Sequence, residues 1–124
     1  MLAIFGVDAL NAETFLNHGF VCVDKSIEQE LLVVNTFRSI KAEDIIFIKD
    51  FTPQTGLRVK AAGIALSSYP AEIDSEVRIP VKWVWRGVKF IDEFNEKYSR
   101  CGDPFYKERS ITVRREIIDL MSGK

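Results

Sequence analysis

The segment Val77–Trp85 constrains the fold more than any other part of this chain. Its apolar and basic residues alternate with a period of two, and this period is typical of a β-strand with one buried and one wet face. The pattern therefore predicts a strand with both tryptophans on its apolar side, at least one of them in the core. The apolar set is Ile79, Val81, Trp83 and Trp85, and the basic set is Arg78, Lys82 and Arg86.

The remaining segments predict a mixture of strands and helices that does not alternate regularly, which argues against a doubly wound sheet. We therefore expect one α+β domain over residues 1–124, built on a curled mixed sheet or pseudo-barrel with short peripheral helices. Residues 68–75 are expected to form a polar loop, and Arg86-Gly87 a turn. The small residues Ala61–Gly63 indicate the close approach of another backbone. Strands are predicted at 2–7, 20–23, 45–51, 57–67, 77–85, 88–91 and 110–113, and helices at 11–17, 26–37, 92–99 and 114–121.

Length and charge set limits on the class of protein. The chain has 124 residues, enough for one domain with a good core but not for two. Its 17 basic and 18 acidic residues give a net charge of −1, which argues neither for nor against a polyanionic partner. The N-terminus has no basic region, and Asp8 interrupts its apolar run. The sequence therefore predicts a cytoplasmic protein without a membrane partner.

The motifs of common enzyme classes are absent from the sequence. It contains no GxGxxG, GxxxxGK[ST], GxSxG or HExxH, and no lysine has an acid two residues before it. His18 is the only histidine, so a histidine-rich metal site cannot be built. Cys22 and Cys101 are isolated and belong to no CxxC motif. These absences predict a protein that is not an enzyme and carries no metal or cofactor.

One segment, Arg78–Phe90, is locally basic and aromatic. It has four cations and no acid, interleaved with two tryptophans and a phenylalanine. Cations for phosphates and ring faces for bases are what a nucleic-acid surface requires, and Arg58 and Lys60 could widen this patch. The alternative interpretation is structural: a tryptophan in the core and basic protection of an edge strand.

The segments Ile40–Lys49 and Gly56–Ala65 resemble the core pattern of PUA-like domains, especially their EVE and restriction-sensor relatives. That pattern places an apolar strand after a lysine and a Gly-Asp pair, then a glycine-containing strand, then a tryptophan strand. Val81–Val84 falls in the corresponding order. One position departs from the pattern, because Glu43 stands where relatives usually carry glycine in the tight turn before Asp44.

The resemblance implies a pseudo-barrel whose cleft accepts a nucleotide, often a modified base flipped out and held between aromatics. It therefore implies non-enzymatic recognition of DNA or RNA. Two other functions stay open: a protein-interaction module, such as a phage-borne or defence-related factor, and a binder of a small nucleotide or metabolite. The interaction module predicts an exposed apolar patch of Trp85, Phe90 and Phe105-Tyr106. The expected base-binding residues are Trp83, Trp85, Phe51 and Tyr69, and the expected phosphate-binding residues are Lys49, Arg58, Lys82 and Arg86.

Overall fold

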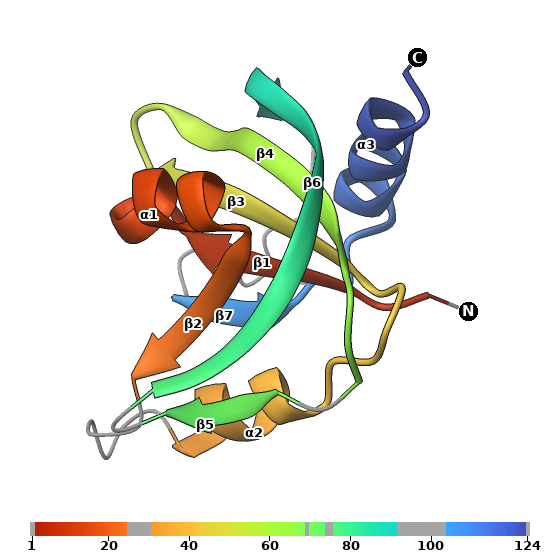
Figure 1. The fold of residues 1–124 in the computed structure, drawn as a ribbon. Helices are drawn as coiled ribbons and strands as arrows, with labels where there is room; N and C mark the ends of the chain where they lie inside the picture. Colours follow the sequence, from red (N-terminus) through yellow and green to blue (C-terminus); the bar gives the residue numbers. More distant parts are fainter. Residues whose placement is uncertain (1, 25–30, 69, 74–75, 92–103, 124) are drawn as a thin grey trace.

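A computed structural model describes residues 2–24, 31–68, 70–73, 76–91 and 104–123 of the chain. They form three helices, a short 3₁₀ turn and seven strands, and the seven strands make up one sheet (Figure 1). In chain order these elements are β1 (Ile4–Asp8), η1 (Ala9–Asn11), α1 (Ala12–His18), β2 (Phe20–Asp24), α2 (Leu31–Arg38), β3 (Ile45–Thr52), β4 (Gly56–Ala65), β5 (Ala71–Ile73), β6 (Glu76–Ile91), β7 (Phe105–Lys107) and α3 (Ile111–Met121).

The sheet is mixed and strongly curled, which confirms the predicted fold class. Its strand order is β2-β6-β4-β3-β1-β7, and β5 pairs with β6 beside this path. The neighbours β1 and β3 are parallel, whereas every other pair is antiparallel. The long strand β6 carries the curl, because its first part pairs with β2 and β5 and its second part with β4 (Figure 1).

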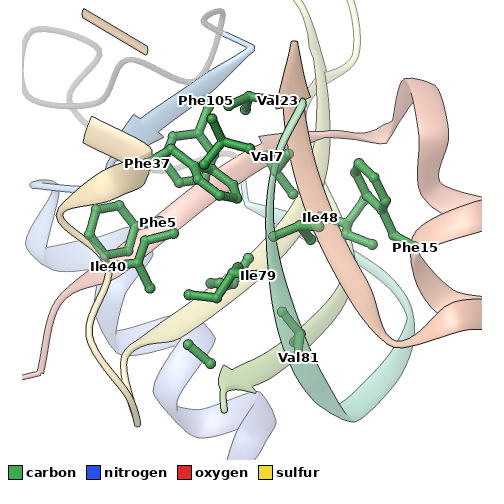
Figure 2. Close-up of a cluster of buried hydrophobic side chains, with 14 of the residues drawn as sticks. Phe5, Val7, Phe15, Val23, Phe37, Ile40, Ile48, Ile79, Val81 and Phe105 are labelled. Carbon is green, nitrogen blue, oxygen red and sulfur yellow. The ribbon is translucent and has the colours of Figure 1, made fainter. Parts of the chain in front are cut away.

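Apolar side chains cover both faces of the sheet, in two separate clusters. The inner cluster lies on the face that α1, α2 and β2 cover (Figure 2). The outer cluster lies on the opposite face, against α3, which contributes Val113 and Ile117. Successive residues of β3 alternate between the clusters, as Ile45 and Phe47 belong to the outer one and Ile46 and Ile48 to the inner one. This double burial explains why β3 is apolar along both faces.

The tight turn before β3 forms even though it lacks glycine. Glu43 has a φ of 77°, in the left-handed region that favours glycine. Its N–H donates to the carbonyl of Ala65, and the buried carboxylate of Asp44 accepts from the N–H groups of Ala3 and Lys41. These bonds hold the turn against the entry to β1 and offset the strain at Glu43.

Three local predictions are wrong. No turn interrupts β6 at Arg86-Gly87, because β6 is one strand of 16 residues that bends through register shifts against β4. The segment expected as a polar loop contains β5, which pairs with the start of β6. The strand predicted at 110–113 is instead the beginning of α3, where the Ser110 hydroxyl accepts from the N–H of Val113. The predicted helix at 92–99 and the start of the helix predicted at 26–37 lie outside the described residues.

Candidate nucleic-acid interface

Three irregularities in strand pairing, one opposite β3 and two opposite β6, decide which side chains of β4 and β6 share a face. Opposite β3, Ile48 pairs with Ala61 and Lys49 with Val59, so Lys60 is the extra residue of β4. Opposite β6, Ala62 pairs with Trp85 and Gly63 with Trp83, so Val84 is the extra residue of β6. Further along β6, Arg86 pairs with Ala61 and Lys89 with Val59, so Gly87 and Val88 together lie opposite Lys60. Such bulges reverse the side to which the following residues point.

The second bulge separates the two tryptophans, so the prediction that they share one face is wrong. Directly paired residues of antiparallel strands point to the same face. Trp83 therefore lies on the inner face and packs against the inner cluster, whereas Trp85 lies on the outer face with Ala62 and the outer cluster. Both indoles are only partly buried.

Each indole has a defined contact. Trp83 Nε1 donates to the carbonyl of Phe15 at 2.9 Å, which ties β6 to α1. Trp85 lies across Gly87, where an added Cβ would stand 2.9 Å from its Cζ2 atom. The close approach predicted at Ala61–Gly63 is confirmed, since a Cβ on Gly63 would stand 2.5 Å from the backbone oxygen of Lys82.

Beyond the inner cluster, the inner face of β4 and β6 becomes basic and aromatic. Arg86 pairs with Ala61 of the inner cluster, and further along the strands Phe90 pairs with Arg58. Arg86 is exposed, and Phe90 is 57% exposed. Among the residues that the structure describes, Arg86 forms no ion pair. Five residues share this face of β4 and β6, and we call them the inner strip: Arg58, Lys60, Trp83, Arg86 and Phe90.

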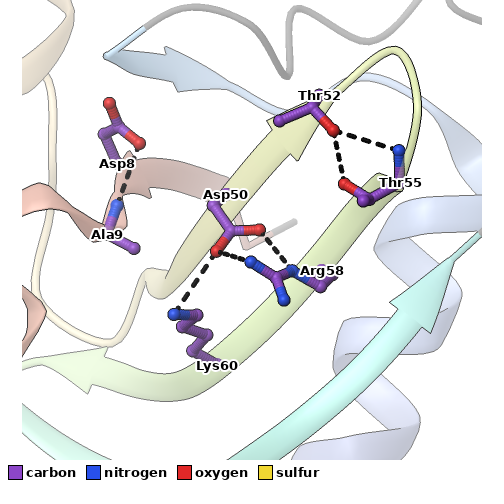
Figure 3. Close-up of polar contacts among 7 residues, drawn as sticks. All are labelled: Asp8, Ala9, Asp50, Thr52, Thr55, Arg58 and Lys60. Atoms are coloured by element: carbon purple, nitrogen blue, oxygen red, sulfur yellow. Dashed lines mark hydrogen bonds and ion pairs between the residues drawn. The ribbon is translucent and has the colours of Figure 1, made fainter.

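One carboxylate lies beside the inner strip and engages two of its cations (Figure 3). Arg58 donates to both oxygens of Asp50, from Nε to Oδ1 at 2.7 Å and from Nη2 to Oδ2 at 2.6 Å. Lys60 Nζ lies 3.3 Å from Oδ2 of the same carboxylate. The hydrogen bonds from Arg58 hold the pKa of Asp50 below its usual value, and Lys60 acts in the same direction against the opposing effect of burial. In turn, Asp50 raises the pKa of Arg58.

Three further predicted site residues, Lys82, Phe51 and Lys49, are not on this strip. Lys82 is exposed but lies on the outer face, because it pairs with Ile64, which pairs with Ile45 of the outer cluster. Phe51 is half-buried against the outer cluster. Lys49 is only 2% exposed, and its Nζ lies 5.4 Å from the centroid of the Tyr106 ring. That burial keeps it from contacting a phosphate at the surface. Tyr69 lies outside the described residues.

The two remaining cations of the segment Arg78–Phe90 already have partners. Arg78 forms an ion pair with Glu76 at 2.9 Å and lies 4.2 Å from the centroid of the Phe20 ring. Lys89 Nζ lies 3.8 Å from an oxygen of Glu116 on α3, on the outer face. The basic segment is therefore divided between two faces, and Arg86 is its exposed cation on the inner one.

The apolar patch expected for a protein-interaction module does not form. Phe90 is exposed and Trp85 is half-buried, but Phe105 and Tyr106 are buried at 2% and 3% exposure. Within the described ranges, no three His, Cys, Asp or Glu side chains are grouped as metal ligands. No helix in that same part of the chain is long and apolar enough to cross a membrane.

The sequence placed Phe90 and Lys60 in the wider basic and aromatic patch but not among the expected binding residues, and it gave Asp50 no role. Phe90 stands four residues after Arg86, and this even spacing indicates a shared face only if the strand continues through Arg86-Gly87, where the sequence predicted a turn. The contribution of Lys60 depends on the bulge in β4, for which the sequence offers no comparable indication.

No protein-family model matches the chain, and no curated protein matches its sequence. The fold class is therefore shown by the structure alone.

Proposed function

We propose that this protein binds nucleic acid, without catalysing a reaction on it, through the inner strip. The observation that carries this proposal is the strand register, which brings an exposed cation and exposed ring surface to one face: Arg86 with Phe90, beside Trp83. On this surface Arg86 contacts a phosphate, while an unstacked base lies against Phe90.

The geometry favours bases that are already exposed over bases stacked inside a duplex. A ring on a sheet surface binds a base by its flat face, which a paired and stacked base does not offer. From Trp83 to Phe90 the strand spans about 17 Å, estimated at roughly 3.3 Å per residue over the five positions between their β4 partners Gly63 and Arg58. That length suits a run of about four nucleotides, at the lower end of site sizes for sheet-based single-strand binders. The resemblance to PUA-like domains extends the proposal to a flipped or modified base.

The test compares two matched variants, Arg86→Gln on the inner face and Lys82→Gln on the outer face. Both side chains are exposed cations of β6, so each variant removes one charge without opening the core. Binding to fluorescently labelled single- and double-stranded oligonucleotides is measured over a series of salt concentrations. Far-UV circular dichroism checks that both variants remain folded.

We expect wild type to bind single strands more tightly than duplexes, with an affinity that falls as salt rises. Arg86→Gln should weaken binding and reduce the slope of log affinity against log salt by about 0.7, the value for one phosphate neutralised on a single strand. Lys82→Gln should leave the slope nearly unchanged. If the two variants weaken binding equally, the inner strip is not the interface. If wild type binds no oligonucleotide at low salt, the protein does not have this function.

A further inference from the structure

The cluster of Arg58, Lys60 and Asp50 has more positive charge than a structural ion pair needs. Arg58 alone satisfies both carboxylate oxygens of Asp50, in the two-pronged geometry that arginine also uses for phosphate. Lys60 adds a second cation to an oxygen that is already engaged. The cluster therefore has a net charge of +1, and its side chains remain partly exposed, at 36% for Arg58, 37% for Lys60 and 23% for Asp50.

This cluster lies next to the exposed ring of the inner strip. Arg58 is the direct register partner of Phe90, so the two residues are neighbours on one face, and from there the Arg58 guanidinium reaches across to Asp50 on β3. A nucleotide stacked on Phe90 would bring its own phosphate to within reach of Arg58 and Lys60. The carboxylate of Asp50 occupies the place where such a phosphate would receive the same hydrogen bonds (Figure 3).

We infer that Arg58 and Lys60 form a second phosphate subsite of the nucleic-acid interface, and that Asp50 is a built-in competitor for it. This inference rests on the proposed function and deepens it. In the free protein Asp50 holds both cations in position and screens their charge. A bound strand must displace the carboxylate or share the two cations with it, so Asp50 sets how tightly and how salt-sensitively the protein binds.

The test is the variant Asp50→Asn, with Glu116→Gln as its matched control. Each substitution removes one negative charge from an ion-paired acid. Asp50→Asn releases Arg58 and Lys60, and Glu116→Gln releases Lys89. Asp50 lies on the inner face, whereas Glu116 pairs with Lys89 on the outer face. Affinity for a labelled single-stranded oligonucleotide is measured over a salt series beside wild type and Arg86→Gln.

We expect Asp50→Asn to bind about 3- to 10-fold more tightly at about 50 mM salt, with a slope steeper by about 0.7 for each further phosphate that the protein neutralises. Glu116→Gln should change neither quantity. In the double variant Asp50→Asn/Lys60→Gln, part of the increase in affinity should be lost, which ties the effect to these two cations rather than to a loosened hairpin.

Three results would overturn the subsite, and they separate it from the proposed function. If Asp50→Asn binds like wild type while Arg86→Gln binds more weakly, the interface stands but the subsite does not. If Glu116→Gln increases affinity as much as Asp50→Asn does, the effect is one of net charge. If neither wild type nor Asp50→Asn binds, both the subsite and the proposed function are wrong.

Discussion

Replacing Gly63 with alanine tests the bulge that sends the two tryptophans to opposite faces. A Cβ at this position would stand 2.5 Å from the backbone oxygen of Lys82, 2.8 Å from Val81 Cγ1 and 3.0 Å from Trp83 Cα. Ordinary van der Waals distances begin near 3.4 Å, so the closest distance is short by 0.9 Å. Two of the three obstacles are backbone atoms of β6, which cannot rotate away as a side chain can.

The magnitude follows from two opposing effects. Overpacking a tightly packed site costs about 1–3 kcal/mol. Replacing glycine with alanine also restricts the unfolded chain, and this effect raises the free energy of unfolding by about 0.4–1 kcal/mol. Because β4 and β6 must separate to admit the methyl group, we expect a net loss of about 2 kcal/mol. For a chain of this length that loss lowers Tm by about 6–10 °C.

The matched comparison is Gly87→Ala, in the same strand pair. The added Cβ there meets the Trp85 indole at 2.9 Å, and this side chain can shift. We therefore expect its stability to stay within about 0.5 kcal/mol of wild type. Thermal unfolding followed by far-UV circular dichroism measures both variants. Tryptophan fluorescence reports on Trp83 and Trp85, which are the two tryptophans of the chain. If Gly63→Ala melts no lower than Gly87→Ala, the close backbone approach does not determine the cost.

Two further predictions concern a turn and an ion pair. Glu43→Gly should stabilise the protein by about 0.5–1 kcal/mol in urea unfolding, because relief of left-handed strain, about 1–2 kcal/mol, exceeds the entropy cost of glycine, about 0.5–1 kcal/mol. The control Ala42→Gly changes an exposed neighbour without a positive φ, and it should destabilise the protein. If Glu43→Gly is less stable than wild type, Glu43 is not strained. Arg58→Gln should lower the urea midpoint at pH 7. Since the pKa of Asp50 is lowered in the folded state, its stabilising effect is present above its ordinary value of 3.8 and is lost as the pH falls through the lower folded value. The difference in urea midpoint between Arg58→Gln and wild type should therefore be smaller below about pH 4 than at pH 7. An equal difference under the two conditions would refute the link to the ionisation of Asp50.

Much of the fold could be predicted because its elements have local causes. The period-two pattern of Val77, Ile79 and Val81 corresponds to a strand with these residues in the inner cluster. Gly19 ends α1 in the left-handed conformation, as its place after His18 indicates. The mixed order of strands and helices correctly predicted an α+β fold. These features depend on residues a few positions apart, so a single sequence contains them.

The candidate site was harder to predict, because it depends on the pairing between strands. Residues two apart share a face only where the register between paired strands is regular. The extra residue Val84 shifts the register between Trp83 and Trp85, so these two residues point to opposite faces. The burial of Lys49 has a different origin, because Lys49 follows the regular alternation of β3 onto the outer face, where it lies beside Tyr106 of β7, a strand distant in sequence. Nothing in the sequence near Lys49 distinguishes it from a surface lysine.

The amino-acid sequence by itself determined most of the segments that become strand or helix, that the chain lacks familiar catalytic motifs, and that its cations and rings gather in one segment. Only the tertiary structure decided which of those side chains meet. A residue's preference for strand or helix acts over its near neighbours, whereas the face to which it points depends on every register shift between it and its partner strand. Arg86 and Phe90 therefore join Arg58 on one surface, while Lys82 and Trp85, close to them in sequence, lie on the other.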